Sequence, residues 1–387
     1  MKRNLPYRAA LAVVLMASVM AYMSSFGGTA RRFSILFVGD ILLANEAEQH
    51  IHKKGLEYPF WKIKQELLKY DFIFANMESP ITKRGVPVTD KPYVFRVKPD
   101  DAVCLRDLKI DAVSIANNHL MDYNAEGMED TIDTLDALNI RHTGGGKNLT
   151  EARRPAILEY GDTSIIILAY CNRPPEDYYA TDTKPGIAPL DLALIREDIE
   201  SYKLPNNIVV VSLHWGIEQT HEPQRSQVAE AHAIIDAGAD AIIGHHPHWP
   251  QGIELYRGKP VIYSLGNFIN GYINPIERDN IAVGFYYDGN KLELIKIVPL
   301  AGRNRQIRFQ PHVLEGTQAT SFLKLIRNLS LKLKTSIEIA DGLGLIKLSE
   351  KPAREITDEK RSGPSRGVQN YVIPKPPRVP AIKTGNR

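Results

Sequence analysis

The sequence predicts an α/β protein organised around a mainly parallel sheet. Short apolar runs alternate along the chain with stretches of helical periodicity, which is typical of parallel strands joined by helices. Two further apolar runs, 281–287 and 292–298, flank Asp288-Gly289, a typical hairpin turn. The later part of the sheet is therefore expected to contain antiparallel strands.

The predicted elements follow one another from residue 33. The apolar runs that predict strands are 33–38, 72–75, 112–116, 164–169, 208–213, 239–243 and 260–265, with a short one at 140–142. Helical spacing of apolar residues predicts helices that begin near residue 45 and that cover 61–68, 100–108, 128–138 and 227–237. We expect these elements to form one ordered domain over 33–315.

The composition narrows the function classes. The chain has 387 residues, of which 43% are hydrophobic and 24% charged, so it is long enough to bury a sizeable core. The formal net charge is only +3, which argues against a general nucleic-acid binder. The two cysteines, Cys104 and Cys171, exclude a disulfide framework and are expected to be buried free thiols.

The N-terminal segment, 1–32, has the character of an export signal. Basic residues precede an uncharged apolar run over 9–23, and small residues follow it. Gly28-Thr29-Ala30 is an acceptable cleavage site, but the run can also be retained as a membrane anchor. Either outcome predicts an extracytoplasmic protein, membrane-anchored or secreted.

The C-terminal part differs in character from the predicted domain. Residues 316–348 are expected to form a helical extension, because 321–337 is a basic amphipathic stretch that either packs on the domain or docks on a membrane surface. Residues 349–387 are rich in Pro, Lys and Arg and poor in large apolar side chains. That composition predicts a disordered tail.

Potential metal ligands follow the predicted strands repeatedly. In open α/β sheets, ligands bind beyond the carboxyl ends of the strands, so these side chains are expected to lie together. Imidazoles suit zinc and iron, carboxylates suit manganese, and a carboxylate such as Glu78 can bridge two ions about 3.5–4 Å apart. The residues in these positions are Asp40, Glu78, Asn118 with His119, His214, and His246 with His248.

The strands are followed, in chain order, by the motifs Gly39-Asp40, Asn76-Met77-Glu78, Asn117-Asn118-His119 with Asp122, His214-Trp215-Gly216, Gly244-His-His-Pro-His248 and Ser264-Leu-Gly-Asn-Phe268. This series resembles the CapA family of poly-γ-glutamate capsule-biosynthesis proteins, whose fold is similar to that of calcineurin-like metallophosphoesterases. The resemblance covers about 33–300. It implies a four-layer α/β/β/α sandwich of the metallophosphatase type and an extracytoplasmic, membrane-anchored location.

The resemblance also implies roles for the individual residues, around one or two divalent ions of manganese, iron or zinc. His119 is implied as the general acid for the leaving group, held by Asp122, because a histidine pKa lies near the working pH. His246 is preferred to His245 as a ligand because it lies two positions before His248. The implied metal ligands are Asp40 and His248 for a first ion, Asn118, His214 and His246 for a second, and Glu78 between them.

The chain departs from the ordinary phosphoesterase pattern at two strands. Leu42 stands where that pattern has a histidine, and Asn76-x-Glu78 replaces Gly-Asp-x-x-Asp. The first ion therefore loses a ligand, although the CapA-like pattern carries the same substitutions. A separate alternating stretch with Lys91, Tyr93 and Arg96 is expected either to line a site for an anionic substrate or to form a half-exposed edge strand.

Three functions follow from this reading. The first is a role in assembling, exporting or anchoring poly-γ-glutamate or capsule polymer, with a metal-dependent hydrolase-like site. The second is a general extracytoplasmic metallophosphoesterase, and the third is a non-catalytic metal-binding scaffold of a membrane synthase complex. The expected partners are polyglutamate or another anionic envelope polymer, membrane synthase subunits and, through the N-terminal segment, the membrane; no nucleic acid is expected.

Overall fold

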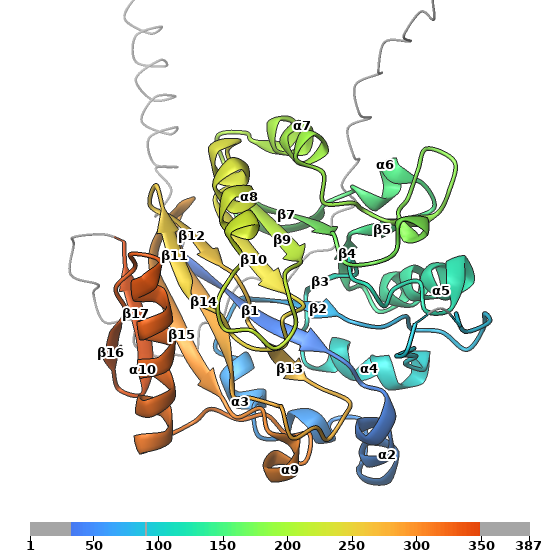
Figure 1. Ribbon diagram of the computed structural model, residues 1–387, viewed down its shortest axis with the longest axis horizontal. Coiled ribbons are helices and arrows are strands. Elements are labelled where there is room, and N and C mark those ends of the chain that lie inside the picture. Colours follow the sequence, from blue (N-terminus) through green and yellow to red (C-terminus); the bar gives the residue numbers. More distant parts are fainter. Residues whose placement is uncertain (1–31, 90, 349–387) are drawn as a thin grey trace, which may run out of the picture. The chain divides into compact units, whose positions relative to one another are not determined.

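Residues 32–89 and 91–348 are described by the computed structural model of the chain (Figure 1). The predicted export signal and the predicted disordered tail lie outside these residues. Within the described part of the chain, none of the helices combines the length and the apolar character needed to cross a membrane.

The first sheet joins a parallel half to an antiparallel half, in the order β16-β17-β15-β14-β1-β2-β3-β4. The antiparallel half contains the predicted hairpin at Asp288-Gly289, which joins β14 to β15. The parallel half comprises β1 (Arg32–Ile41), β2 (Phe72–Met77), β3 (Ala112–Ser114) and β4 (Arg141–Thr143), and β13 (Asn267–Ile269) pairs with the end of β1. The antiparallel half comprises β14 (Asn280–Asp288), β15 (Lys291–Leu300), β16 (Glu338–Ala340) and β17 (Leu343–Lys347).

The second sheet has the order β11-β12-β10-β9-β7-β6. Its four central strands are parallel, and an antiparallel strand closes each edge. Its strands are β6 (Ala156–Tyr160), β7 (Thr163–Cys171), β9 (Asn207–His214), β10 (Ala241–His245), β11 (Ile253–Tyr256) and β12 (Lys259–Ile262). A separate two-stranded pair is formed by β5 (Gly145–Gly146) and β8 (Gly186–Ile187).

Helices cover the sheets on their outer sides (Figure 1). Those between the strands of the first sheet are α2 (Asn45–Lys54), α3 (Lys64–Leu67), α4 (Pro99–Asp107) and α5 (Asn124–Ala137). Those between the strands of the second sheet are α7 (Leu192–Tyr202) and α8 (Arg225–Asp236). The remaining helices are α6 (Leu149–Ala152), α9 (Asn304–Ile307), α10 (Gly316–Lys332) and the 3-10 turns Tyr58–Phe60 and Glu176–Tyr178.

The alternation of side chains along the strands builds three apolar layers. In β1, Ile35 and Phe37 enter a core that also contains side chains of the second sheet, whereas Leu36 and Val38 enter the core beneath α4 and α5. The second sheet divides in the same way, since β7 contributes Ile165 to the core between the sheets and Ile166 to the core beneath α7 and α8. The order is helices, sheet, sheet, helices, which is the four-layer α/β/β/α sandwich.

The C-terminal segment is only partly helical. Helix α10 covers Gly316–Lys332, and its Leu323 and Ile326 enter the core between the sheets. After the helix, β16 and β17 extend the first sheet beside β15, so the expected helical extension over 316–348 ends in two strands. The sequence missed these strands because each is short, with three residues in β16 and five in β17.

Candidate metal centre

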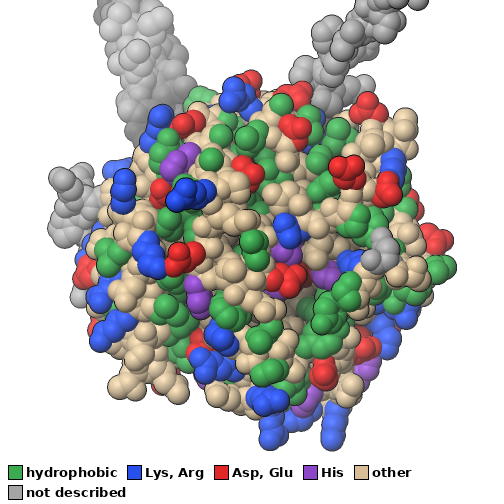
Figure 2. Space-filling model, viewed as in Figure 1, with side chains coloured by type: hydrophobic (Ala, Val, Ile, Leu, Met, Phe, Trp, Pro, Cys, Tyr) green, Lys and Arg blue, Asp and Glu red, His purple; other side chains and the backbone are tan. Residues whose placement is uncertain are grey.

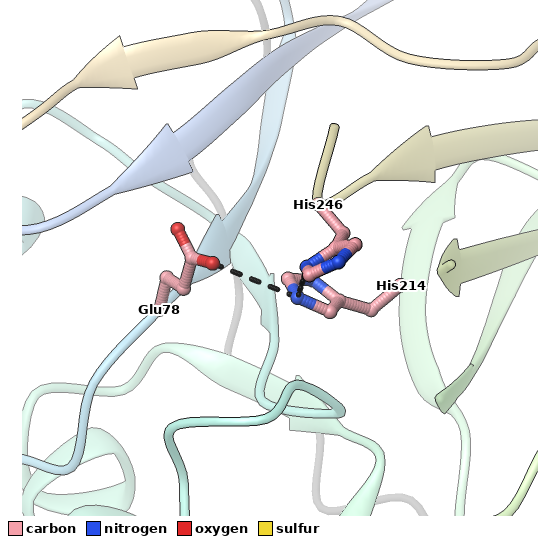
Figure 3. A group of neighbouring side chains, drawn as sticks. All are labelled: Glu78, His214 and His246. Atoms are coloured by element: carbon pink, nitrogen blue, oxygen red, sulfur yellow. Dashed lines mark hydrogen bonds and ion pairs between the residues drawn. The ribbon is translucent and has the colours of Figure 1, made fainter. Parts of the chain in front are cut away.

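The predicted metal ligands come from the carboxyl ends of strands in both sheets and lie together. Figure 3 shows Glu78, which follows β2, facing His214 at the end of β9 and His246 just after β10. Figure 2 shows histidine, acidic and basic side chains gathered near the centre of the face over which these strands end. The facing sheets therefore bring together residues up to about two hundred positions apart. The residues from the first sheet are Asp40, Glu78 and Asn118, and those from the second are His214, His246 and His248.

Two glycines allow the strands to approach one another at this edge. A Cβ atom added to Gly39 would lie 1.9 Å from the carbonyl oxygen of Gly266, and one added to Gly244 would lie 1.9 Å from the carbonyl oxygen of Tyr263. No larger side chain fits at either position, so each glycine permits the close backbone contact that places the next ligands. Asp40 directly follows Gly39, and His246 lies two positions after Gly244.

One group of ligand atoms surrounds His214. Its Nε2 atom lies 2.8 Å from Oδ1 of Asn118, 3.2 Å from Nδ1 of His246 and 3.6 Å from Oε1 of Glu78. Ligand atoms bound to one ion at about 2.1 Å are separated from one another by about 3–3.5 Å. The three distances lie in or close to that range, so the four groups are near enough to one another to bind a single divalent ion.

A second group of ligand atoms adjoins the first and shares Glu78 with it. His248 lies with Nδ1 3.4 Å from Oδ2 of Asp40 and with Nε2 3.8 Å from Oε1 of Glu78. Leu42 is buried in the core and contributes no ligand. This group therefore has three protein ligands, one fewer than the group around His214.

The polar atoms of both groups fit a cation. Oδ2 of Asp40 and Oε1 of Glu78 are buried and make no hydrogen bond to any described residue. A buried polar atom without a partner costs about 1–3 kcal/mol, and more when it is charged. A divalent ion bound between them would satisfy these atoms, and carboxylate, amide and imidazole ligands suit manganese, iron or zinc.

The carboxylates differ in their electrostatics. Burial raises the pKa of Glu78 well above its usual value, and the charge of Asp40 adds to this. Burial also acts to raise the pKa of Asp40, but the hydrogen bonds and charges of His245 and His248 outweigh it, so that pKa lies well below its usual value. Asp40 is therefore the ionised partner, and bound positive charge is needed to stabilise both carboxylates together.

The three histidines of the site also differ in their pKa values. Burial holds the pKa of both His214 and His246 well below the usual value, so both rings are neutral, which is the form that binds metals. Burial also lowers the pKa of His248, but Glu78 and Asp40 outweigh it and raise that pKa to about 10.

The loop after β10 holds its histidines in an unusual backbone conformation. His246 and His248 have φ angles of 93° and 57°. Non-glycine residues rarely adopt positive φ, and such strain costs about 1–3 kcal/mol per residue. Backbone strain of this kind collects at functional sites, which is consistent with a role for both rings.

His119 lies beside the metal groups and is held by Asp122. Its Nδ1 atom lies 2.9 Å from Oδ2 of Asp122, the shortest contact of that nitrogen, so we assign the Nδ1 proton to this bond. The ring of Phe95 packs at 4.2 Å from the imidazole, and burial lowers the pKa of His119. Nε2 is then the nitrogen left to exchange a proton with a bound molecule.

Lys91, which the sequence placed either at a site for an anionic substrate or on an edge strand, contributes a cation beside His119. Its ammonium group lies 2.5 Å from Oδ1 of Asp122 and donates to the carbonyl oxygen of Asn118 at 2.6 Å. Residues 91–96 form no strand, so the edge-strand alternative is wrong. Arg96 instead covers the ring of Tyr123, with 4.6 Å between the guanidinium and the ring centroid.

Three further polar residues orient the ligands. His245, expected beside the site, is buried with Nδ1 3.2 Å from Oδ1 of Asp40. Asn76 donates to the same oxygen at 2.8 Å, and Oδ1 of Asn267 lies 2.9 Å from Nδ1 of His248. A partner on the second ring nitrogen fixes the orientation of a metal-binding histidine. Asn267 follows the apolar run 260–265 that predicts a strand, and this position was the signal that could have identified it, although the structure places it at the start of β13.

Comparison with known proteins places these residues within a family. Residues 34–272 match the family described as "Bacterial capsule synthesis protein PGA_cap". The chain is 30% identical over 269 residues to "PGA biosynthesis protein CapA" of Bacillus subtilis, covering 69% of this chain and 71% of that protein. It is 27% identical over 276 residues to "Capsule biosynthesis protein CapA" of Bacillus anthracis, covering 70% and 67%.

A comparison with solved structures finds a more distant similarity. The chain resembles the structure of the NAD nucleotidase of Haemophilus influenzae with a TM-score of 0.41 and 12% sequence identity. The match covers 80% of this chain and 57% of that one.

Proposed function

This chain belongs to the bacterial capsule synthesis protein family PGA_cap, and from that premise we propose that it takes part in poly-γ-glutamate or capsule biosynthesis through a metal-dependent, phosphoesterase-like site. The basic and apolar character of residues 1–32 supports an extracytoplasmic location, either membrane-anchored or secreted. An anionic envelope polymer is the partner proposed for the domain, with membrane synthase subunits beside it.

The observation that carries the proposal is the convergence of ligands from two sheets. The atoms of Glu78, His214 and His246 lie within 4.8 Å of one another, and so do those of Asp40, Glu78 and His248. Asp40 and Glu78 each present a buried carboxylate oxygen that makes no hydrogen bond within the described residues. A site built only for stability would pair such atoms with protein donors or acceptors.

The residues of the chain suit hydrolysis or transfer at an anionic centre. Divalent ions, when bound, lower the pKa of a coordinated water and neutralise charge on a phosphoryl group. His119 is positioned to protonate a leaving group from Nε2, because Asp122 holds the opposite nitrogen. Lys91 contacts both Asp122 and the carbonyl oxygen of Asn118. It therefore keeps His119, the proposed proton donor, next to the metal ligand Asn118.

Leu42 favours a second candidate function, a metal-binding scaffold without turnover. Its side chain is 4% exposed and belongs to the apolar core, where the ordinary phosphoesterase pattern has a ligand. A first ion with fewer protein ligands is held less firmly, which weakens two-metal catalysis. In this case the ions would stabilise the edge of the sandwich against a membrane synthase.

The two candidates are separated by measuring metal and turnover on the same preparation. The full chain is purified in detergent, loaded with Mn²⁺ and assayed for bound metal and for hydrolysis of a generic phosphodiester. Bound metal with turnover that depends on His119 supports the hydrolase. Bound metal without turnover supports the scaffold, and absence of bound metal contradicts both.

The capsule role is tested separately in the host. Deleting the gene is expected to lower the amount of γ-linked polyglutamate at the cell surface, and the intact gene is expected to restore it. A copy with His214→Ala is expected to fail, because that ring contacts Glu78, Asn118 and His246. Unchanged polymer in the deletion strain would overturn the capsule role while leaving the metal site standing.

A further inference from the structure

The loop between β9 and α8 carries an exposed carboxylate over the metal centre. Glu218 offers an oxygen that lies, together with ring nitrogens of His246 and His248, in a group whose members are all within 4.8 Å of one another. The loop is tied to the histidine segment, because the backbone nitrogen of Gln219 donates to the carbonyl oxygen of Pro247 at 2.8 Å. Glu218 is therefore held near both rings.

The side chain of Glu218 has no other structural role in the described part of the chain. No hydrogen bond or ion pair joins it to another described residue. Glu222, four positions later in the same loop, instead pairs with Lys332 of α10. The two glutamates share a loop and an exposed setting, but only Glu218 faces the metal ligands.

Glu218 reaches His248, which belongs to the group with three protein ligands, as well as His246 of the group around His214. The group with three protein ligands contains Asp40, Glu78 and His248, and buried Leu42 adds no ligand to it. The side chain of His248 is 29% exposed, whereas those of Asp40 and Glu78 are 1% and 4% exposed. A further ligand can therefore approach this group from the solvent side, past His248.

We propose that Glu218 is a metal ligand that approaches from the solvent side and compensates for the histidine missing at position 42. A carboxylate is a good ligand for manganese, and it adds a negative charge that helps to neutralise a second dication. The inference rests on the metal site of the proposed function. It adds to that site a residue from a loop that contributes no ligand in the motifs described above.

The test is a Mn²⁺ titration of the full chain by isothermal calorimetry, with EDTA-treated protein as the starting material. Glu218→Gln is expected to weaken the binding of one Mn²⁺ ion at least about tenfold. Even the loss of a residue that only orients a metal ligand lowers metal affinity by about 10–100-fold. Glu222→Gln removes the same charge from the same loop and is expected to stay within about twofold of the unaltered chain, since it faces away from the ligands.

A second variant separates direct binding from a general effect of charge. Glu218→Asp keeps the charge but shortens the side chain by one methylene, so direct binding predicts a loss of affinity close to that of Glu218→Gln. Unaltered affinity in Glu218→Asp, or in Glu218→Gln, overturns the inference while leaving the metal site standing. If the unaltered chain binds no Mn²⁺, both the inference and the metal site of the proposed function are wrong.

Discussion

The ammonium group of Lys91 lies 2.5 Å from Oδ1 of Asp122, and the other oxygen of the same carboxylate lies 2.9 Å from Nδ1 of His119. Asp122 is fully buried, and its Oδ2 atom also accepts a hydrogen bond from the backbone nitrogen of Phe95 at 2.6 Å. A lysine from an irregular loop thus neutralises the carboxylate that orients the proposed proton donor.

Lys91→Met is expected to lower the free energy of unfolding by about 3 kcal/mol, because it leaves a buried carboxylate without its cation. Hydrolysis of the phosphodiester is expected to fall about tenfold, while bound Mn²⁺ is unchanged. The matched control is Lys83→Met, which removes an exposed pair with Asp100 and is expected to change stability by less than about 1 kcal/mol. Equal effects of the two variants in denaturant titrations would contradict the role of Lys91.

His119→Ala is expected to lower turnover by about a hundredfold or more, because it removes the proposed general acid while the ligand atoms remain. The bound metal, measured by plasma emission spectrometry, is expected to equal that of the unaltered chain. His246→Ala is the comparison variant and is expected to lose metal, since its ring lies 3.2 Å from that of His214 within the ligand group. Equal loss of metal in both variants would show that the roles are assigned wrongly.

His245→Leu tests the residue that lies beside the ligands. The imidazole is buried 3.2 Å from Asp40, which also accepts a hydrogen bond from Asn76. Loss of a residue that only orients a ligand weakens metal binding about 10–100-fold, so saturating Mn²⁺ is still expected to fill the site. A site that stays empty at saturating Mn²⁺ would make His245 a ligand instead.

Glu277→Gln tests the pH dependence of stability away from the metal centre. Burial raises the pKa of Glu277 to about 7, although hydrogen bonds from Asn304 and Asn270 oppose this. Because the folded state keeps its proton to higher pH than the unfolded chain, stability is greatest below the unfolded pKa of about 4.3 and falls as pH rises to about 7.

The variant removes this titration. The free energy of unfolding of the variant minus that of the unaltered chain is therefore expected to be larger at pH 8 than at pH 5. Urea titrations at the two pH values measure the difference. The same difference at both pH values would mean that Glu277 does not ionise with a raised pKa in the folded protein.

The strands and the fold class were predictable because the signals are local. The apolar runs at 33–38 and 208–213 fall within β1 and β9, and the alternation of Leu36 and Phe37 between two cores follows from strand geometry alone. The helical extension was only half predicted, because β17 forms by pairing with β15 and β16 by pairing with β17. Both cysteines are buried and free, as their apolar surroundings indicated.

The sequence by itself determined which residues follow the strands, and hence which side chains gather at the carboxyl edge. Asp40, Glu78 and His214 were identifiable because parallel strands share that edge whatever the details of packing. The order of their motifs was also sufficient to indicate the family.

Only the tertiary structure decided which loops turn back over that edge. Lys91 and Glu218 stand in irregular loops of the folded chain, and nothing local specifies that one reaches Asp122 and the other lies beside His246 and His248. The face-to-face packing of the two sheets places those segments, because it brings strand ends that are far apart in the chain within a few ångströms of one another. Contacts of that kind depend on the whole core, so the charge environment of the site is a property of the folded chain.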